Sequence, residues 1–349
     1  MLRQNQRNRQ DRRHSVAATS AATDRLPGAR WAARPARLLS DYRTEIAIAV
    51  AIVVIEGVVG ILAPSALTWG NLSNIGQAGS PLVIMAIGQL LVVITGGIDL
   101  SVGSIFSLVG MVTALTMTHG FGAVDATLLG LAIGTVVGLV NGLLVTVAGL
   151  APFVVTLITF AACGSLAFIV TNGQSLPVTD PHYWLLNGGT LVPGVVNYLL
   201  FCVILLVVFE LFLRKAVAGR WVYAVGSNSN ASRLLGIPVR RTVAAAYLGS
   251  GLLAAFASVL SLSYISNAEA TAGANLMLQA IAAVVIGGAS LFGGTGSAVG
   301  AVLGALMITV IQNGVNLIGV NSFWQGSVTA VVILIAVLID RVAKSRRRT

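Results

Sequence analysis

The stretch TGGIDLSVGS, residues 95–104, separates two long runs of the chain that contain no charged residue. Glycine relaxes the backbone, and a pair of glycines can end a helix, so Gly96 and Gly97 predict a break inside an otherwise continuous apolar region. We therefore expect one span over residues 76–95 and another over 101–117. The stretch also places a carboxylate, that of Asp99, between two segments whose composition is typical of lipid-buried helices.

Composition gives the class of the protein. Of the 349 residues, 56% are hydrophobic and only 9% are charged, and the mean hydropathy is +0.90, far from the usual balance of a soluble protein. At about 1.5 Å of rise per residue, the recurring apolar runs match a hydrocarbon core of roughly 30 Å. The sequence predicts an all-α polytopic membrane protein.

The net charge of +10 comes from 21 basic residues that fall in three clusters, within residues 1–43, 214–241 and 341–348. Excess Lys and Arg beside membrane spans marks the cytoplasmic side, so we place both termini and the 214–241 loop in the cytoplasm. We do not expect nucleic acid as a partner, because the basic segments lack interleaved aromatic residues and flank spans.

This assignment requires an even number of crossings between neighbouring basic clusters. Six apolar segments precede the middle loop and four follow it, so about ten spans is consistent, with eight spans plus broken or re-entrant pieces as the alternative. The predicted spans are 46–62, 76–95, 101–117, 125–148, 152–171, 194–213, 243–262, 276–292, 297–318 and 323–339.

The predicted organisation has three parts. Residues 1–45 form a disordered, Arg-rich cytoplasmic tail that contacts anionic lipid or, alternatively, a partner protein. Residues 46–340 form the transmembrane domain, with a cytoplasmic loop over 214–241, and residues 341–349 form a second basic tail. Cys163 and Cys202 lie inside predicted spans, so neither a disulfide framework nor a metal site is expected.

The sequence shows few residues suited to catalysis. His14 lies in the tail, and His119 and His182 lie in predicted external loops, so no histidine is placed to activate a nucleophile within the membrane. The two lysines, Lys215 and Lys344, do not stand in the Gly-Lys-Ser/Thr setting of a phosphate-binding loop. We expect no enzyme activity and no cofactor in this chain. The 39 glycines instead suit close helix packing, as in a transporter bundle.

Three acidic residues lie in or beside the predicted spans. Glu210 is four residues before Arg214, so we interpret it as an interfacial charge with an ion-pair partner. Glu56, in the first span, is either a structural acid or a transport residue. Asp99 stands where an N-cap residue of the following helix would stand, two residues before Ser101, and its carboxylate would accept backbone N–H bonds. Contact with a translocated solute is a second, compatible role for Asp99.

The middle loop contains a short predicted helix. Ser229 or Asn230 can cap a helix over residues 231–235, which Gly236 can end and Pro238 prevents from continuing. Such a helix would be held between two spans on the cytoplasmic face.

The side chains of this short helix favour docking. Leu234, Leu235 and Ile237 would give it an apolar edge, and Arg233 a charged one, as in helices that bind in a groove of a partner protein. The alternative is a helix that lies on the lipid surface.

Two segments resemble a known family. TGGIDLSVGS (95–104) resembles the signature of ribose/xylose-type ABC sugar permeases, in the superfamily of branched-chain amino acid and sugar permeases, and GSNSNASRLLGI (226–237) is similar to their ATPase-binding loop. The segments 71–97 and 280–306 extend the likeness, which covers roughly residues 45–340.

The resemblance implies a permease subunit of a bacterial inner-membrane importer. Its implied partners are a second permease subunit, identical or closely homologous, a cytoplasmic ATPase that binds ATP and Mg²⁺, and an external sugar-binding protein. It implies a translocation pathway or gate at Gly96, Gly97, Asp99 and Ser101, and ATPase coupling through Gly226, Asn228, Ala231, Arg233, Leu234 and Gly236. The chain departs from the usual loop pattern with Ser232 and Leu235, which puts its partner preference in question.

Two other classes of membrane protein remain as alternatives. A proton-coupled secondary transporter could use Glu56 or Asp99, because acids inside membranes mark proton relays. Against this class, no Arg, Lys or His lies within a predicted span to pair with them. A channel or a structural membrane protein is the third possibility, but no residue distinguishes it. Dependence on an ATPase and insensitivity to a proton uncoupler would separate the first class from the second.

Overall fold

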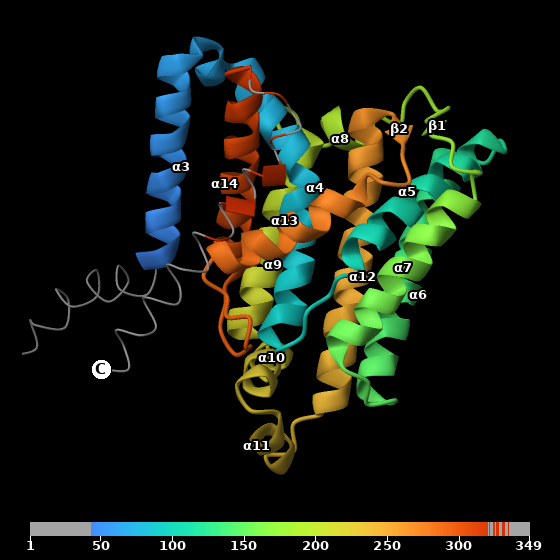
Figure 1. Cartoon of the computed structure of the whole chain (residues 1–349), viewed down its shortest axis with the longest axis vertical. Coiled ribbons are helices and arrows are strands. Elements are labelled where there is room, and N and C mark those ends of the chain that lie inside the picture. Colours follow the sequence, from blue (N-terminus) through green and yellow to red (C-terminus); the bar gives the residue numbers. More distant parts are fainter. Residues whose placement is uncertain are drawn as a thin grey trace, which may run out of the picture. The chain divides into compact units, whose positions relative to one another are not determined.

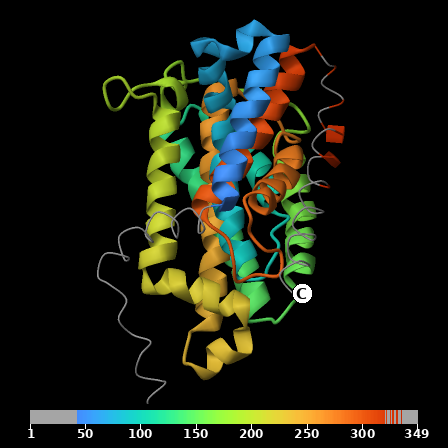
Figure 2. The ribbon, with the colours of Figure 1, turned by 90° about the vertical axis from the view of Figure 1, so that its left-hand side faces the viewer.

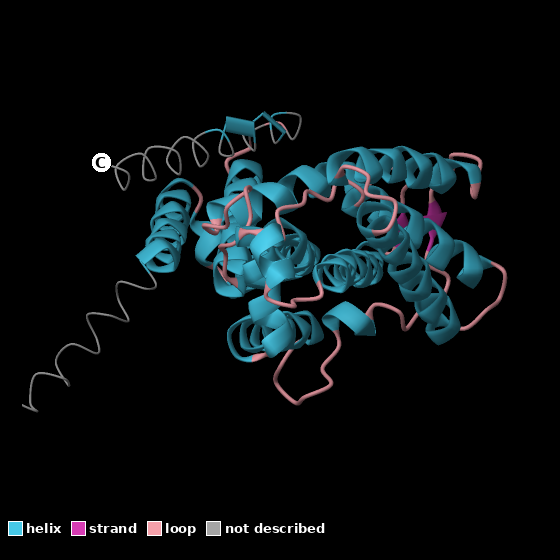
Figure 3. Cartoon of the chain, turned by 90° about the horizontal axis from the view of Figure 1, so that it is seen from below, coloured by secondary structure: helices cyan, strands magenta, loops and turns pink. Residues whose placement is uncertain are grey.

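The computed structural model describes residues 43–319 and positions 321, 324, 326, 327, 330, 331 and 334. This part is almost entirely helical, which confirms the all-α class (Figure 1, Figure 3). The helices are α3 (Arg43–Leu62), η1 (Pro64–Leu67), α4 (Trp69–Ile94), α5 (Val102–Thr118), α6 (Ala123–Thr146), α7 (Pro152–Ile169), α8 (Leu185–Gly188), α9 (Asn197–Lys215), α10 (Val217–Ser227), α11 (Ser229–Leu234), α12 (Val239–Ile265), α13 (Gly273–Ile286) and α14 (Ala298–Leu317), and the strands are β1 (Leu176–Pro177) and β2 (Asn267–Ala268).

Seven of the described helices are long and apolar enough to cross a membrane: α3, α4, α6, α7, α9, α12 and α14. The apolar helices α5 and α13 are shorter. The chain is therefore a multi-pass membrane protein, although the predicted count of about ten spans is not confirmed. The predicted span 323–339 lies outside the described residues, apart from isolated positions. Helix α3 begins at Arg43, inside the predicted tail 1–45, and the rest of that tail also lies outside the described residues.

Helix α4 forms the centre of the bundle. Every residue from Gly79 to Ile94 is buried, because α9, α12, α13 and α14 all pack against α4. This explains why that stretch of the helix is largely apolar on all sides. Pro81 lies in its interior and cannot donate to the carbonyl of Gln77. The Ser80 hydroxyl donates to that carbonyl instead, at 2.9 Å, so the helix continues through the proline.

Small residues allow α6 and α12 to approach closely. A Cβ atom on Gly138 would lie 2.5 Å from the carbonyl oxygen of Tyr247, and one on Gly251 would overlap the carbonyl oxygen of Gly134. Glycines at such contacts let two backbones touch, which is how helices associate where no hydrophobic effect drives them together.

Helices α10 and α11 lie at one end of the described unit, together with the connection between α6 and α7 (Figure 1, Figure 2). The opposite end contains η1, α8 and a two-stranded antiparallel sheet, in which Leu176 pairs with Ala268 and Pro177 with Asn267. The predicted middle loop and the predicted external loops therefore lie at opposite ends.

Cysteine labelling tests the orientation of these ends. In a background without Cys163 and Cys202, we expect a membrane-impermeant maleimide to label Ser175→Cys from outside, and to label Ser229→Cys only after the membrane is opened. Both native residues are exposed. Asn187, which lies between the predicted spans 152–171 and 194–213, is buried against α12 and is unsuitable for labelling. Labelling of Ser229→Cys in intact cells would contradict the predicted orientation.

Candidate functional site

The break after α4 is formed by Gly96 and Gly97, the two glycines from which it was predicted. Gly96 has a φ of +85°, a left-handed conformation that favours glycine. Its N–H donates to the carbonyl of Val93 at 2.9 Å, and the N–H of Gly97 donates to that of Val92 at 3.1 Å. These two bonds form a Schellman motif, which satisfies carbonyls at the end of a helix. Gly96 and Gly97 therefore end α4, as predicted.

Asp99 lies in this break and is fully buried. One carboxylate oxygen accepts hydrogen bonds from the Ser101 N–H at 2.9 Å and the Ser101 hydroxyl at 2.6 Å. The other oxygen accepts a bond from the Ser250 hydroxyl of α12 at 2.9 Å. The N-cap of α5 is Ser101, so the predicted N-cap position of Asp99 is wrong. Asp99 instead closes a turn just before the helix and connects it to α12.

The polar network around Asp99 extends into two further helices. Asn141 of α6 donates to the Ser101 hydroxyl oxygen at 2.8 Å, and Thr159 of α7 donates to the amide oxygen of Asn141 at 2.6 Å. Thr156 of α7 donates to the carbonyl of Ile98 at 3.1 Å. Buried polar groups need such partners, so this network fixes the break to α6, α7 and α12.

A second break lies between α13 and α14, and α13 ends in the same way as α4. Gly288 has a φ of +88°, its N–H donates to the carbonyl of Val285 at 3.0 Å, and the N–H of Ala289 donates to that of Val284 at 3.1 Å. This is again a Schellman motif. After the break, the Ser297 hydroxyl caps α14 by accepting the N–H of Gly300 at 3.0 Å.

Two carboxylates lie at the start of α14. Glu210 of α9 accepts the N–H groups of Ala298 at 3.1 Å and Val299 at 3.4 Å, and it also forms the predicted ion pair with Arg214. The carboxylate of Glu45 accepts the Ser297 hydroxyl at 2.8 Å. Negative charge is favourable at the positive end of a helix dipole, so Glu210 has a structural role at α14 that the sequence did not indicate.

The two breaks meet at Gly226 of α10. The N–H of Gly294 in the second break donates to the carbonyl of Ile94 at the first break, at 2.8 Å. A Cβ atom on Gly226 would overlap that same carbonyl oxygen and would lie 2.7 Å from the nitrogen of Gly294. Gly226 therefore fits a space that no other amino acid can occupy without moving backbone. We call this contact between the two breaks and α10 the glycine junction.

Tyr223, one turn before Gly226, also attaches α10 to the second break. Its hydroxyl donates to the carbonyl of Gly296 at 2.8 Å. Burial, with a smaller contribution from the charge of Glu210, raises the pKa of the Tyr223 phenol. The phenol therefore keeps the proton that this hydrogen bond requires.

Helix α11 follows α10 directly and has a cap at each end. The side chain of Asn228 accepts the N–H of Ala231 at 2.9 Å, so Asn228 is the N-cap and the predicted caps Ser229 and Asn230 are wrong. Gly236 ends the helix with a φ of +78°, as predicted. Both ends of α11 are therefore fixed by residues next to the helix in the sequence.

The tip of α11 presents apolar side chains outward. Leu234 and Leu235 are 89% and 80% exposed, and Arg233 beside them is also exposed. Ser232 faces the other way and is buried. Leucines this exposed are typical of a surface that a partner protein or lipid covers.

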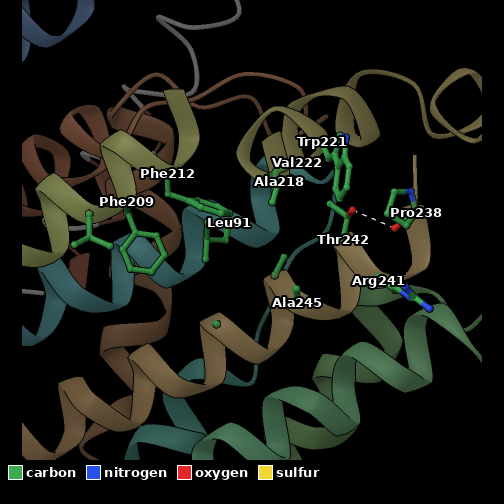
Figure 4. Close-up of a pocket in the computed structure, with 13 residues that line it drawn as sticks. Leu91, Phe209, Phe212, Ala218, Trp221, Val222, Pro238, Arg241, Thr242 and Ala245 are labelled. Carbon is green, nitrogen blue, oxygen red and sulfur yellow. Dashed lines mark hydrogen bonds between the residues drawn. The ribbon is translucent and has the colours of Figure 1, made fainter. Parts of the chain in front are cut away.

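An apolar cavity of about 560 Å³ separates part of α10 from α9 and α12 (Figure 4). Trp221 and Ala218 of α10 line one side, and Phe209 and Phe212 of α9 another, while Arg241 of α12 lies at its edge. Its walls are mostly hydrocarbon, so it suits neither a sugar nor an ion. It leaves space beside α10 that packed helices usually fill.

The structure brings some predicted site residues together and separates others. Gly96, Gly97, Asp99 and Ser101 all lie in one break, and Gly226 lies against it. The other predicted coupling residues, Asn228, Ala231, Arg233, Leu234 and Gly236, lie on α11 or at its ends. Glu56 lies on α3, and its carboxylate oxygens have no hydrogen-bond partner within the described residues.

Comparison with known proteins places these features in a family. The family model described as "Branched-chain amino acid transport system / permease component" matches residues 71–337. A protein of Sinorhizobium fredii named "Probable ABC transporter permease protein y4mJ" is 71% identical over 310 residues, which are 89% of this chain and 93% of that protein.

Two further relatives are named for the sugars that they import. The ribose import permease protein RbsC of Escherichia coli strain K12 is 38% identical, over 83% of this chain and 92% of its own length. The fructose import permease protein FruF of Bifidobacterium longum is 35% identical, over 77% of this chain and 79% of its own length. No solved structure matches the chain. The chain therefore belongs to the ABC permease family of branched-chain amino acid and sugar transport systems, and within it to the sugar permeases that its two motifs resemble.

Proposed function

We propose that this chain is the membrane-spanning permease subunit of an ATP-driven importer in the bacterial inner membrane, and that it translocates a sugar or a related small neutral solute. An external binding protein delivers the solute. A separate cytoplasmic ATPase binds ATP and Mg²⁺ and supplies the energy. A second permease subunit, identical or closely homologous, completes the membrane part. Family membership supports this assignment.

The glycine junction is the observation that carries the proposal. An importer whose energy comes from another subunit needs a rigid connection from its cytoplasmic surface to its gate. Here Gly226 of α10 contacts both helix breaks, and α11, with its exposed leucines, follows α10 after one residue. A force applied at Leu234 therefore reaches the residues around Gly96 and Gly294 through one short helical segment. Rigid elements transmit such displacements better than flexible loops do.

The alternative of proton coupling gains no support from Asp99. Both of its oxygens accept hydrogen bonds, from Ser101 and Ser250, and the side chain is fully buried. A proton carrier must exchange its proton with water on each side in turn, which would break this network. We therefore propose that Asp99 stabilises the gate rather than carries a proton.

Substitutions on α11 test the coupling role. We expect Leu234→Asp to weaken ATPase association strongly and, with it, the stimulation of ATP hydrolysis by loaded binding protein. Burying a leucine against a partner contributes about 1.5–3 kcal/mol, so its loss weakens association about ten- to hundredfold. Arg233→Glu should act in the same direction by reversing a charge at the same surface. The measurements are co-purification of the ATPase and ATP hydrolysis by the purified complex.

Leu150→Asp is the matched control, because Leu150 is also exposed and lies in the α6–α7 connection at the same end of the unit. It should leave association and hydrolysis close to those of the unaltered protein. If the double variant Leu234→Asp/Arg233→Glu keeps both, the coupling assignment is wrong, and α11 is a helix that lies on the lipid surface.

A further inference from the structure

A polar cleft of about 300 Å³ lies between α4, α13 and α14, and Tyr264 near the end of α12 also lines it. In α4 the cleft residue Asn74 precedes the fully buried stretch, and in α14 the cleft residues lie in the second half of the helix. The cleft is therefore displaced from both breaks, toward the end that contains η1 and away from α11 (Figure 1). Helices α4, α13 and α14, which supply most of its lining, also adjoin the breaks.

Side-chain amides dominate the polar lining of this cleft. They come from Asn74, Gln279, Gln312, Asn313 and Asn316. Polar groups inside a membrane bundle are costly when they face lipid, so a cleft lined by such a cluster suits water or a polar solute. Each amide offers both a hydrogen-bond donor and an acceptor, which matches the hydroxyl groups of a polyol, since these also donate and accept.

A reciprocal amide pair holds one wall of the cleft in place. Asn71 of α4 donates to the amide oxygen of Asn313 at 3.0 Å, and Asn313 donates back to that of Asn71 at 3.0 Å. Asn71 also donates to the carbonyl of Ala66 at 2.9 Å. This pair fixes the spacing of α4 and α14 at the cleft, so the polar lining is positioned before any solute arrives.

The cleft also lacks a feature that an amino acid would need. None of the described residues that line it is charged, yet the ammonium and carboxylate of a zwitterionic solute in a low-dielectric site are costly to bury without oppositely charged partners. The family includes both branched-chain amino acid and sugar systems. We propose that this amide-lined cleft is a contact site for a neutral polyhydroxylated solute of monosaccharide size, and that it excludes zwitterionic amino acids.

Gln89 extends this site inward along α4. It is fully buried, and neither its amide nitrogen nor its oxygen has a hydrogen-bond partner among the residues that the structure describes. It lies eleven residues, about three helical turns, after the cleft residue Ala78, and so on the same face of α4. An unsatisfied buried amide costs roughly 1–3 kcal/mol. A solute passing from the cleft toward the first break would supply the missing partners.

The inference rests on the proposed function but is tested without the ATPase. In the background lacking Cys163 and Cys202, we would replace Ala78, an exposed cleft residue, with cysteine in the full-length chain in lipid nanodiscs. The readout is the rate of alkylation with and without D-ribose, D-fructose or D-sorbitol, and with L-leucine. At about 10 mM solute, ten times a Kd of about 1 mM, occupancy should slow alkylation about tenfold.

Protection by at least one of the three neutral probes, and none by L-leucine, is the expected result. Gln279→Leu should remove the protection, and Gln279→Asn, which keeps the amide, should restore part of it. Asn275→Cys is the control. Asn275 lies on α13 one turn before Gln279, is exposed and is outside the cleft lining, so its cysteine should react at a rate that no probe changes.

Three results would overturn the inference. One is equal protection by L-leucine, the second is protection by none of the neutral probes, and the third is an Ala78→Cys thiol that does not react even without solute. Failure of the proposed function looks different, since it would abolish stimulated ATP hydrolysis in the complex while leaving protection of the cleft unchanged.

Discussion

Gly226→Ala should strongly lower the yield of folded, monodisperse protein and its melting temperature, although it adds a single methyl group. The new Cβ would overlap the carbonyl oxygen of Ile94 and would lie 2.7 Å from the nitrogen of Gly294. Both neighbours are backbone atoms at helix breaks, so relief requires movement of two helix ends rather than a change of rotamer. Overpacking a rigid site costs about 1–3 kcal/mol and occasionally more, and we expect the upper end here. The measurements are the yield after size-exclusion chromatography and the melting temperature in detergent.

Gly164→Ala is the matched control. Gly164 lies within α7, and a Cβ atom there would have no heavy atom within 4 Å, so only helix propensity changes. Alanine is better than glycine in a helix by about 1 kcal/mol, and this variant should be as stable as the unaltered protein or slightly more stable. If Gly226→Ala behaves like Gly164→Ala, α10 is not held at the glycine junction, and the proposed route from α11 to the breaks loses its physical basis.

Local sequence predicted the breaks and ends of helices well. Gly96 and Gly97 stop α4 and Gly236 stops α11, because the left-handed backbone conformation at Gly96 and Gly236 is one that glycine adopts without strain. Such endings depend on a few consecutive residues, which a sequence displays directly. The apolar runs likewise identified the membrane class, since burial in lipid is recorded in composition.

Helix α10 is the element that the sequence interpretation missed. Ala218, Trp221, Val222 and Val225 follow the spacing of an amphipathic helix, and this pattern could have revealed it inside the supposed loop. No local sequence pattern could have indicated that Gly226 packs against Ile94. The two residues are far apart in the chain, and only tertiary packing brings them together.

The caps were misplaced for a related reason. The N-cap rule assumes that a helix begins directly after its polar residue. The N-cap of α5 is Ser101, two residues after the predicted Asp99. The N-cap of α11 is Asn228, one residue before Ser229 and two before Asn230, the two predicted caps. For Asp99, the decisive partner is Ser250, which lies 151 residues further along the chain. A carboxylate with one local and one distant partner resembles a simple cap when only its neighbours in sequence are considered.

Asp99→Leu should destabilise the protein more than any other substitution of a polar side chain in the breaks. It leaves the Ser101 N–H, the Ser101 hydroxyl and the Ser250 hydroxyl without the acceptor they now share, in a fully buried site. An unsatisfied buried group costs about 1–3 kcal/mol, so the combined loss is a large part of the roughly 5–15 kcal/mol that stabilises a typical native protein. We expect low yield and a strongly reduced melting temperature, measured in the same detergent as for Gly226→Ala.

Asp99→Asn separates the structural role of Asp99 from a role of its charge. The amide oxygen can still accept from Ser101, and the amide nitrogen can donate to the Ser250 hydroxyl, which also accepts. This variant should therefore fold and assemble, with a melting temperature much closer to that of the unaltered protein, and should retain much of the solute uptake of the complex. If Asp99→Asn folds but uptake is abolished, the negative charge itself acts in transport, because the geometry of the break is preserved while the charge alone is lost.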